Sequence, residues 1–263
     1  MTSFNYLGEV MNVTDTAGQA LNTVTPAKEG WDSGARFYLT MSVLGAVIVF
    51  LGFTPSFYLK SVIHAGLPLT LLTITHGVVY TAWVLLFVVQ SALIVYKRPA
   101  PHRQLGMLGV LLFGAMFTLG YSTAISAGKL GHIPPGAPAP LAFMALPLIG
   151  ITGILFLVGL AVWNRRRNDW HKRLMLASLF GMTIPATQRL AVGVGFAEQG
   201  PWIGFTVAEL LLVVAMAHDY RVNRRIHPAN WTGACALVAA HVGVAWAFAS
   251  PVWLAFATAI TQG

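Results

Sequence analysis

Seven long apolar runs dominate this sequence from residue 37 onward, and they restrict its fold more than any other feature. Each run reaches or approaches the ~20 residues that an α-helix needs to cross the hydrocarbon of a bilayer at 1.5 Å per residue. The sequence therefore predicts an all-α fold, a polytopic membrane helix bundle with seven transmembrane helices. The predicted helices cover residues 37–53, 68–96, 105–127, 141–163, 174–196, 202–220 and 231–260.

Composition supports a lipid environment. Of the 263 residues, 56% are hydrophobic and only 9% are charged, whereas a soluble domain usually carries about 25% charged residues. The formal net charge of +8 would suggest a nucleic-acid partner for a soluble protein, but here the basic residues lie in short loops between apolar runs. We therefore expect the lipid bilayer to be the main partner, and we expect no nucleic-acid binding.

The basic residues also predict the orientation of the bundle. They cluster after the second, fourth and sixth apolar runs, and Lys28 and Arg36 before the first run join the same side. Because loops rich in lysine and arginine stay in the cytoplasm, we expect a cytoplasmic N-terminus and, after seven crossings, a C-terminus outside. The chain then divides into a polar cytoplasmic arm (residues 1–35) and a seven-helix transmembrane domain (residues 36–263). The clustered residues are Lys97, Arg98, Arg103, Arg165, Arg166, Arg167, Lys172, Arg173, Arg221, Arg224 and Arg225.

Four ionisable residues fall within the outer half of the predicted helices, at similar depths by helical rise. His76 and His241 are candidate ligands of a metal or haem, or else neutral imidazoles that bond across helices. Arg189 and Glu209 are expected to form a structural ion pair, although Arg189 is also a candidate anchor for an anionic ligand or a cofactor carboxylate.

A second group of histidines falls at the cytoplasmic ends of the predicted helices. His102, His171 and His218 belong to it, and they are candidates either for interface anchors or for cofactor ligands. One face of the second helix, with i, i+4, i+7 spacing, carries His76 and Trp83 and is expected to face the interior. Trp83 is therefore a candidate lining residue of a cofactor pocket.

Several segments resemble a widespread family of bacterial multi-pass membrane proteins of unknown function. They are FYLTMSVLGAVIVFLGFTPSFYLK (37–60), HGVVYTAWVLLFVVQ (76–90), HRQLG (102–106), HKRLM (171–175) and RL (189–190). The resemblance implies a multi-pass protein of the bacterial inner membrane and leaves its activity open.

The histidines also resemble those of the di-haem transmembrane cytochromes b of the ascorbate-reducible type, in which histidines on four consecutive helices bind two haems. His76, His102 and His171 match that arrangement, while the fourth predicted helix carries no histidine. This resemblance implies haem b as cofactor. It also implies that His241 partners His76 and that the inner pair comes from His102, His171 and His218.

Three classes of function remain open from the sequence. The first is a membrane electron carrier with b-type haem that exchanges electrons across the bilayer or with a quinone. The second is an accessory or structural subunit of a larger membrane complex. The third is a transporter or a lipid-modifying membrane enzyme, with His76, Arg189, Glu209 and His241 as a proton relay or metal site.

Overall fold

The computed structural model describes residues 28–63, 68–132 and 136–262, and within these residues every regular element is helical. An α-helix hydrogen-bonds its backbone N–H and C=O groups within a single segment. A bilayer requires this, because its hydrocarbon contains no water to bond them. The long helices are α2 (Lys28–Phe53), α4 (Leu71–Val95), α5 (Pro99–Lys129), α7 (Ala145–Trp163), α8 (Asn168–Gly193), α9 (Gly200–Asn223) and α10 (Pro228–Ala249). The short ones are the π-helix η1 (Thr54–Tyr58), α3 (Lys60–Ile63), α6 (Pro140–Phe143) and α11 (Pro251–Gln262).

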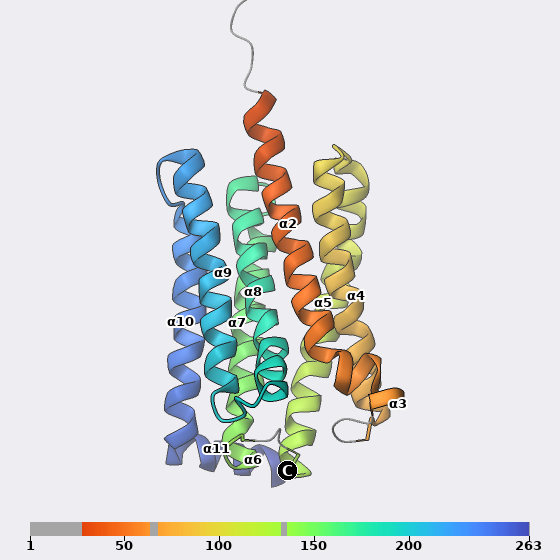
Figure 1. Ribbon diagram of the computed structural model, residues 1–263, viewed down its shortest axis with the longest axis vertical. Coiled ribbons are helices and arrows are strands. Elements are labelled where there is room, and N and C mark those ends of the chain that lie inside the picture. Colours follow the sequence, from red (N-terminus) through yellow and green to blue (C-terminus); the bar gives the residue numbers. More distant parts are fainter. Residues whose placement is uncertain (1–27, 64–67, 133–135, 263) are drawn as a thin grey trace, which may run out of the picture.

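The long helices run antiparallel to their neighbours in the chain and form one bundle (Figure 1). Helix α8 lies in the middle and contacts α2, α7, α9 and α10, while α4 packs against α2 and α5 on one side. Six helical segments have the length and apolar composition to cross a membrane, so the chain is a multi-pass integral membrane protein. They comprise α2 with η1, α4, α5, α6 with α7, α9 and α10.

Helix α8 differs from the others because protein surrounds it rather than lipid. Most of its residues are buried, including Ser178, Thr183 and Thr187. Each of these hydroxyl groups donates a hydrogen bond to a carbonyl one turn earlier in the same helix, at 2.7 to 2.9 Å. A central helix can therefore carry polar side chains that a lipid-facing helix would expose at high cost.

The seventh apolar run does not form one helix, which corrects the predicted span of residues 231–260. Helix α10 ends at Ala249, Ser250 is extended with φ −89° and ψ 121°, and α11 begins at Pro251 and turns across the end of the bundle. Proline disfavours helical conformation in the residue before it, which explains the break. The Trp253 Nε1–H donates to the Leu141 carbonyl at 2.9 Å and fixes α11 there.

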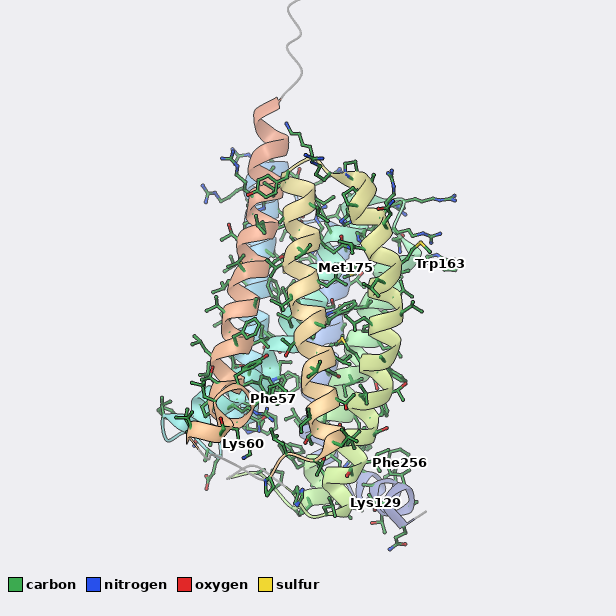
Figure 2. All side chains as sticks on the ribbon, turned by 90° about the vertical axis from the view of Figure 1, so that its right-hand side faces the viewer. Phe57, Lys60, Lys129, Trp163, Met175 and Phe256 are labelled. Atoms are coloured by element: carbon green, nitrogen blue, oxygen red, sulfur yellow. The ribbon has the colours of Figure 1, made fainter. Side chains whose placement is uncertain are left out.

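The two ends of the bundle differ in charge. The basic end is the one where α2, α5, α8 and α10 begin and where α4, α7 and α9 end, and it holds the basic clusters predicted above. The opposite end holds Phe57, Lys60 and Lys129, whereas Met175 lies toward the basic end (Figure 2). Helix α2 begins at Lys28 and so extends into the stretch predicted as a polar arm, of which residues 1–27 lie outside the described residues.

Candidate cofactor site

Two of the predicted inner histidines lie side by side at the basic end. His102 is near the start of α5, and His171 is near the start of α8. Their imidazole centroids are 6.5 Å apart, and the two ring planes are nearly perpendicular, at 89°. Two residues that are distant in the chain thus form a histidine pair between helices.

Each ring of this pair is oriented by a backbone carbonyl through its Nδ1 atom. The His102 Nδ1 atom lies 3.3 Å from the Gln90 carbonyl oxygen, and the His171 Nδ1 atom lies 2.9 Å from the Ala161 carbonyl oxygen. A carbonyl only accepts, so Nδ1 carries the hydrogen in both rings, and in the neutral form Nε2 keeps its lone pair. Histidines that bind metals commonly have this outer contact, because it sets the tautomer and the ring orientation.

The spacing of the pair fits one metal ion bound on two opposite sides. With metal–nitrogen distances of roughly 2 Å, two such imidazoles place their centroids about 6 to 6.5 Å apart. The observed centroid separation of 6.5 Å agrees with this distance. Within the described residues, no group of three or more His, Cys, Asp or Glu side chains is placed to hold a metal ion.

Helix α4 adds polar atoms without partners to the same part of the bundle. The Gln90 Oε1 atom and the Trp83 Nε1 atom are both buried and have no hydrogen-bond partner. Across from them α5 carries Gly106 and Gly109, whose added Cβ atoms would lie 3.5 Å from Gln90 Nε2 and 3.9 Å from Trp83 Cζ3. These separations are ordinary van der Waals contacts, so Gln90 and Trp83 pack directly on α5 while one polar atom of each has no partner.

His218, the third candidate for this inner site, makes a different contact. Its ring stacks on Phe37 with centroids 3.7 Å apart and planes 5° apart, which joins the end of α9 to α2. The structure therefore assigns His218 to helix packing, whereas it brings His102 and His171 together.

The predicted outer pair of His76 and His241 is not assembled, which corrects their assignment as joint metal or haem ligands. His76 is on α4, and His241 is on α10, and these helices lie on opposite sides of the bundle (Figure 1). The His241 ring instead stacks on Phe205, with centroids 4.6 Å apart and planes 2° apart. The structure therefore does not gather the four predicted outer residues at one site.

The predicted ion pair between Arg189 and Glu209 is also wrong. Glu209 Oε1 lies 2.9 Å from His241 Nδ1, so its partner is on α10. Arg189 is exposed, donates from Nη1 to the Pro185 carbonyl at 2.8 Å, and covers the Phe53 ring at 4.3 Å. Helical rise placed the two residues at a common depth, but depth does not determine which way each side chain points around its helix.

Sequence reasoning missed a buried ionic network at the basic end. Arg173 on α8 pairs with Asp219 on α9, and both side chains are almost fully buried. Asp219 also accepts from Asn230 Nδ2 at 3.1 Å and from the His227 backbone N–H at 2.7 Å. This network ties the start of α8 to α9 and α10, and so it positions His171 two residues earlier. The sequence signal for this network is Asp219, a carboxylate near the end of an otherwise mostly apolar helix.

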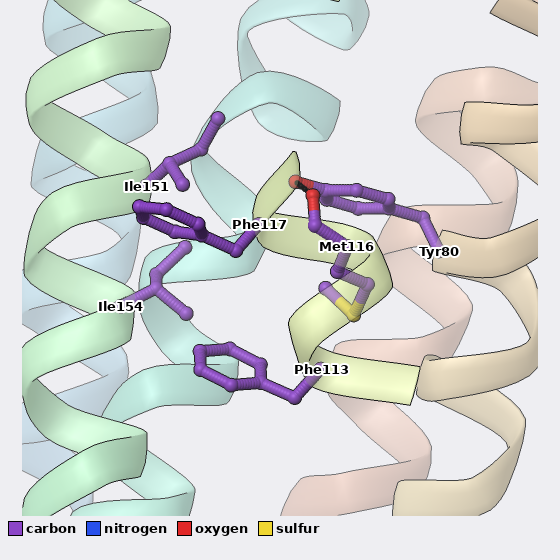
Figure 3. Close-up of a pocket in the computed structure, with 6 residues that line it drawn as sticks. All are labelled: Tyr80, Phe113, Met116, Phe117, Ile151 and Ile154. Carbon is purple, nitrogen blue, oxygen red and sulfur yellow. Dashed lines mark hydrogen bonds between the residues drawn. The ribbon is translucent and has the colours of Figure 1, made fainter. Parts of the chain in front are cut away.

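An apolar notch lies between α4, α5 and α7 (Figure 3). Its polar group is the Tyr80 hydroxyl, which donates to the Met116 carbonyl at 3.3 Å. Gly120 makes room for that hydroxyl, because a Cβ there would lie 2.5 Å from Tyr80 Oη. With its polar group already bonded, the notch offers packing rather than ligand recognition. It is lined by Tyr80, Phe113, Met116, Phe117, Ile151 and Ile154.

Comparisons of this chain with protein-family models, with curated proteins and with solved structures find no match.

Proposed function

We propose that this protein is a membrane electron carrier that holds one b-type haem between His102 and His171. The observation that carries the proposal is the pair itself, with centroids 6.5 Å apart and both Nδ1 atoms at backbone carbonyls. A structural zinc needs four protein ligands and a catalytic zinc needs three. Haem iron takes four nitrogens from its porphyrin and one or two ligands from the protein, so two histidines are enough to hold it. Haem bound there supplies reversible one-electron oxidation and reduction.

The surroundings of the pair suit the rest of a haem. Trp83 and Met175 are apolar neighbours that pack in one core cluster, and both lie deeper in the bundle than the histidines. The basic end also carries Arg103 and Lys172, whose positive charges favour the anionic propionates of a haem at this end of the bundle. Arg189, the alternative candidate anchor for a cofactor carboxylate, lies roughly 27 Å further along α8 at 1.5 Å per residue, too far away to reach this haem.

The proposal includes the number of membrane crossings and the orientation of the bundle. We propose that α8 is the seventh crossing, because it is 26 residues long and runs beside the six apolar segments. The basic end then faces the cytoplasm together with the N-terminus, and the end with α11 faces outward. In a bacterium this is the inner membrane, and the His102–His171 pair lies near its cytoplasmic surface.

An absorption spectrum tests the proposal directly. Wild-type protein, expressed with a supply of haem and purified in detergent, is expected to show a Soret band and, after reduction with dithionite, a sharp α band. His102→Ala and His171→Ala are each expected to remove most of the haem, because each substitution removes one of the two histidines that would hold it.

The matched control is His218→Phe, which changes a third histidine at the same end and keeps an aromatic ring on Phe37. This variant should keep the haem content of the wild type. A wild-type sample that elutes as a single species but contains neither iron nor a Soret band would refute the proposal.

A further inference from the structure

Arg189 presents an exposed cation with unused hydrogen-bond donors near the opposite end of the bundle. A guanidinium carries five N–H groups, of which one bonds the Pro185 carbonyl. The ion pairs among the described residues involve Arg173, His227 and His241, so no carboxylate in that part of the chain neutralises Arg189. The remaining donors are therefore available to a group from outside the bundle.

The framework around Arg189 is rigid because α2 and α8 touch backbone to backbone there. A Cβ added to Gly52 would lie 2.4 Å from the Ala186 carbonyl oxygen, a separation that atoms do not adopt. Ala186 is almost one turn before Arg189, and Phe53, whose ring lies under the guanidinium, directly follows Gly52. This contact holds the guanidinium in place over Phe53.

A π-helical turn follows at the same place. Helix η1 begins at Thr54, directly after Phe53, and holds Phe57. The Phe57 ring rests on α4, where a Cβ added to Gly77 would lie 2.3 Å from it. Such turns are rare and occur frequently at functional sites, since they redirect side chains that a regular α-helix would point elsewhere.

His76 adds a second unsatisfied polar group next to this contact. It directly precedes Gly77, its ring stacks on Tyr80 with centroids 4.1 Å apart, and its buried Nδ1 atom has no hydrogen-bond partner. The link to Arg189 runs through the chain of contacts just described, because Phe53 lies under the guanidinium and Phe57, four residues later, lies against Gly77. Helices α2, α4 and α8 thus bring one cation and one unpaired imidazole nitrogen to the same region.

The position along the bundle indicates what reaches this region. Arg189 lies about one turn, roughly 6 Å, from the end of α8. Leu51 and Leu190 beside it are exposed, as expected of a surface that faces lipid tails. A guanidinium at the border between tails and head groups meets the phosphate layer of the membrane, and guanidinium forms bidentate, charge-assisted hydrogen bonds with phosphate.

We propose that Arg189, with His76 beside it, forms a binding site for the phosphate group of an anionic phospholipid in the leaflet at the end opposite the basic end. This site is independent of the His102–His171 pair. It gives Arg189 a partner that the chain itself does not supply.

Native mass spectrometry of the full-length protein in detergent tests this site. Phosphatidylglycerol is titrated against phosphatidylcholine with the same acyl chains, and the bound lipid is quantified. The wild type is expected to prefer phosphatidylglycerol, and Arg189→Gln is expected to weaken its binding by roughly 10- to 100-fold, the range for losing a hydrogen bond to a charged group. Arg189→Lys should bind at an intermediate level, because it keeps the charge and loses the bidentate geometry.

The control is Lys129→Gln, which removes a positive charge at the same end of the bundle (Figure 2). It should bind phosphatidylglycerol like the wild type. Displacement of the lipid by millimolar inorganic phosphate would overturn the lipid assignment in favour of a soluble phosphate. Equal binding of the two lipids by the wild type, or equal losses in Arg189→Gln and Lys129→Gln, would show that Arg189 merely extends toward water. The wild-type comparison decides the question even where a variant does not fold.

Discussion

At the scale of single residues, the burial of charge determines which substitutions matter most. Arg173 and Asp219 are a buried pair, and Asp219 also accepts from Asn230 and from a backbone N–H. Asp169 and His227 form a pair at 2.9 Å on the surface, where the Asp169 side chain is 51% exposed. Removing one member of a buried pair leaves the other charge uncompensated, whereas an exposed pair is screened by water.

We therefore expect Asp219→Asn to lower the free energy of unfolding by about 3 kcal/mol. The matched control Asp169→Asn should lower it by less than about 1 kcal/mol. Both values can be measured by titrating the purified protein with sodium dodecyl sulfate and following helix content by circular dichroism. Equal effects of the two substitutions would contradict the structural role assigned to Asp219.

At the scale of helices, small residues set how closely two elements approach. Helix α2 lies on α8 at Gly52, where there is space for a hydrogen atom and no room for a methyl group. Gly114 in α5 has nothing within 4 Å of an added Cβ. Close approach at small residues is a principal means of helix association in membranes. Lipid tails are as apolar as the side chains, so helices there gain no hydrophobic free energy by associating and depend on van der Waals packing.

Gly52→Ala is expected to push α2 away from α8 and to lower the thermal unfolding midpoint. Because the obstacle is backbone, the strain cannot be relieved by a side-chain rotation. Gly114→Ala should leave the midpoint unchanged or raise it slightly, since alanine favours helix more than glycine does. A thermal scan of the purified variants in one detergent makes the comparison. A midpoint for Gly52→Ala equal to that of Gly114→Ala would contradict the observed contact.

At the scale of the whole molecule, the two ends of the bundle differ in positive charge, and this difference predicts the orientation in the membrane. Nearly all lysine and arginine residues of the connections lie at the basic end, and α11 closes the other end. By the positive-inside rule we propose that the basic end lies in the cytoplasm. The lipid and haem proposals follow this orientation, with haem near the inner surface and the phosphate site in the outer leaflet.

Cysteine labelling tests this orientation. The chain has one cysteine, Cys235, so Cys235→Ser provides a background without thiols. In that background, Gln262→Cys is expected to react with a membrane-impermeant maleimide in intact spheroplasts, and Arg166→Cys is expected to react only after lysis. Labelling of Arg166→Cys in intact spheroplasts would contradict the proposed orientation.

Hydropathy and helical rise determine where a residue lies along a helix, and both can be counted in the sequence. For this reason the sequence predicted the helical membrane fold, the basic end, and the position of His102 and His171 at that end. Rotation about each helix axis and the choice of neighbouring helix depend on packing between distant segments. Only the tertiary structure therefore decided that His102 meets His171, that Glu209 bonds His241 and not Arg189, and that His76 and His241 stay apart.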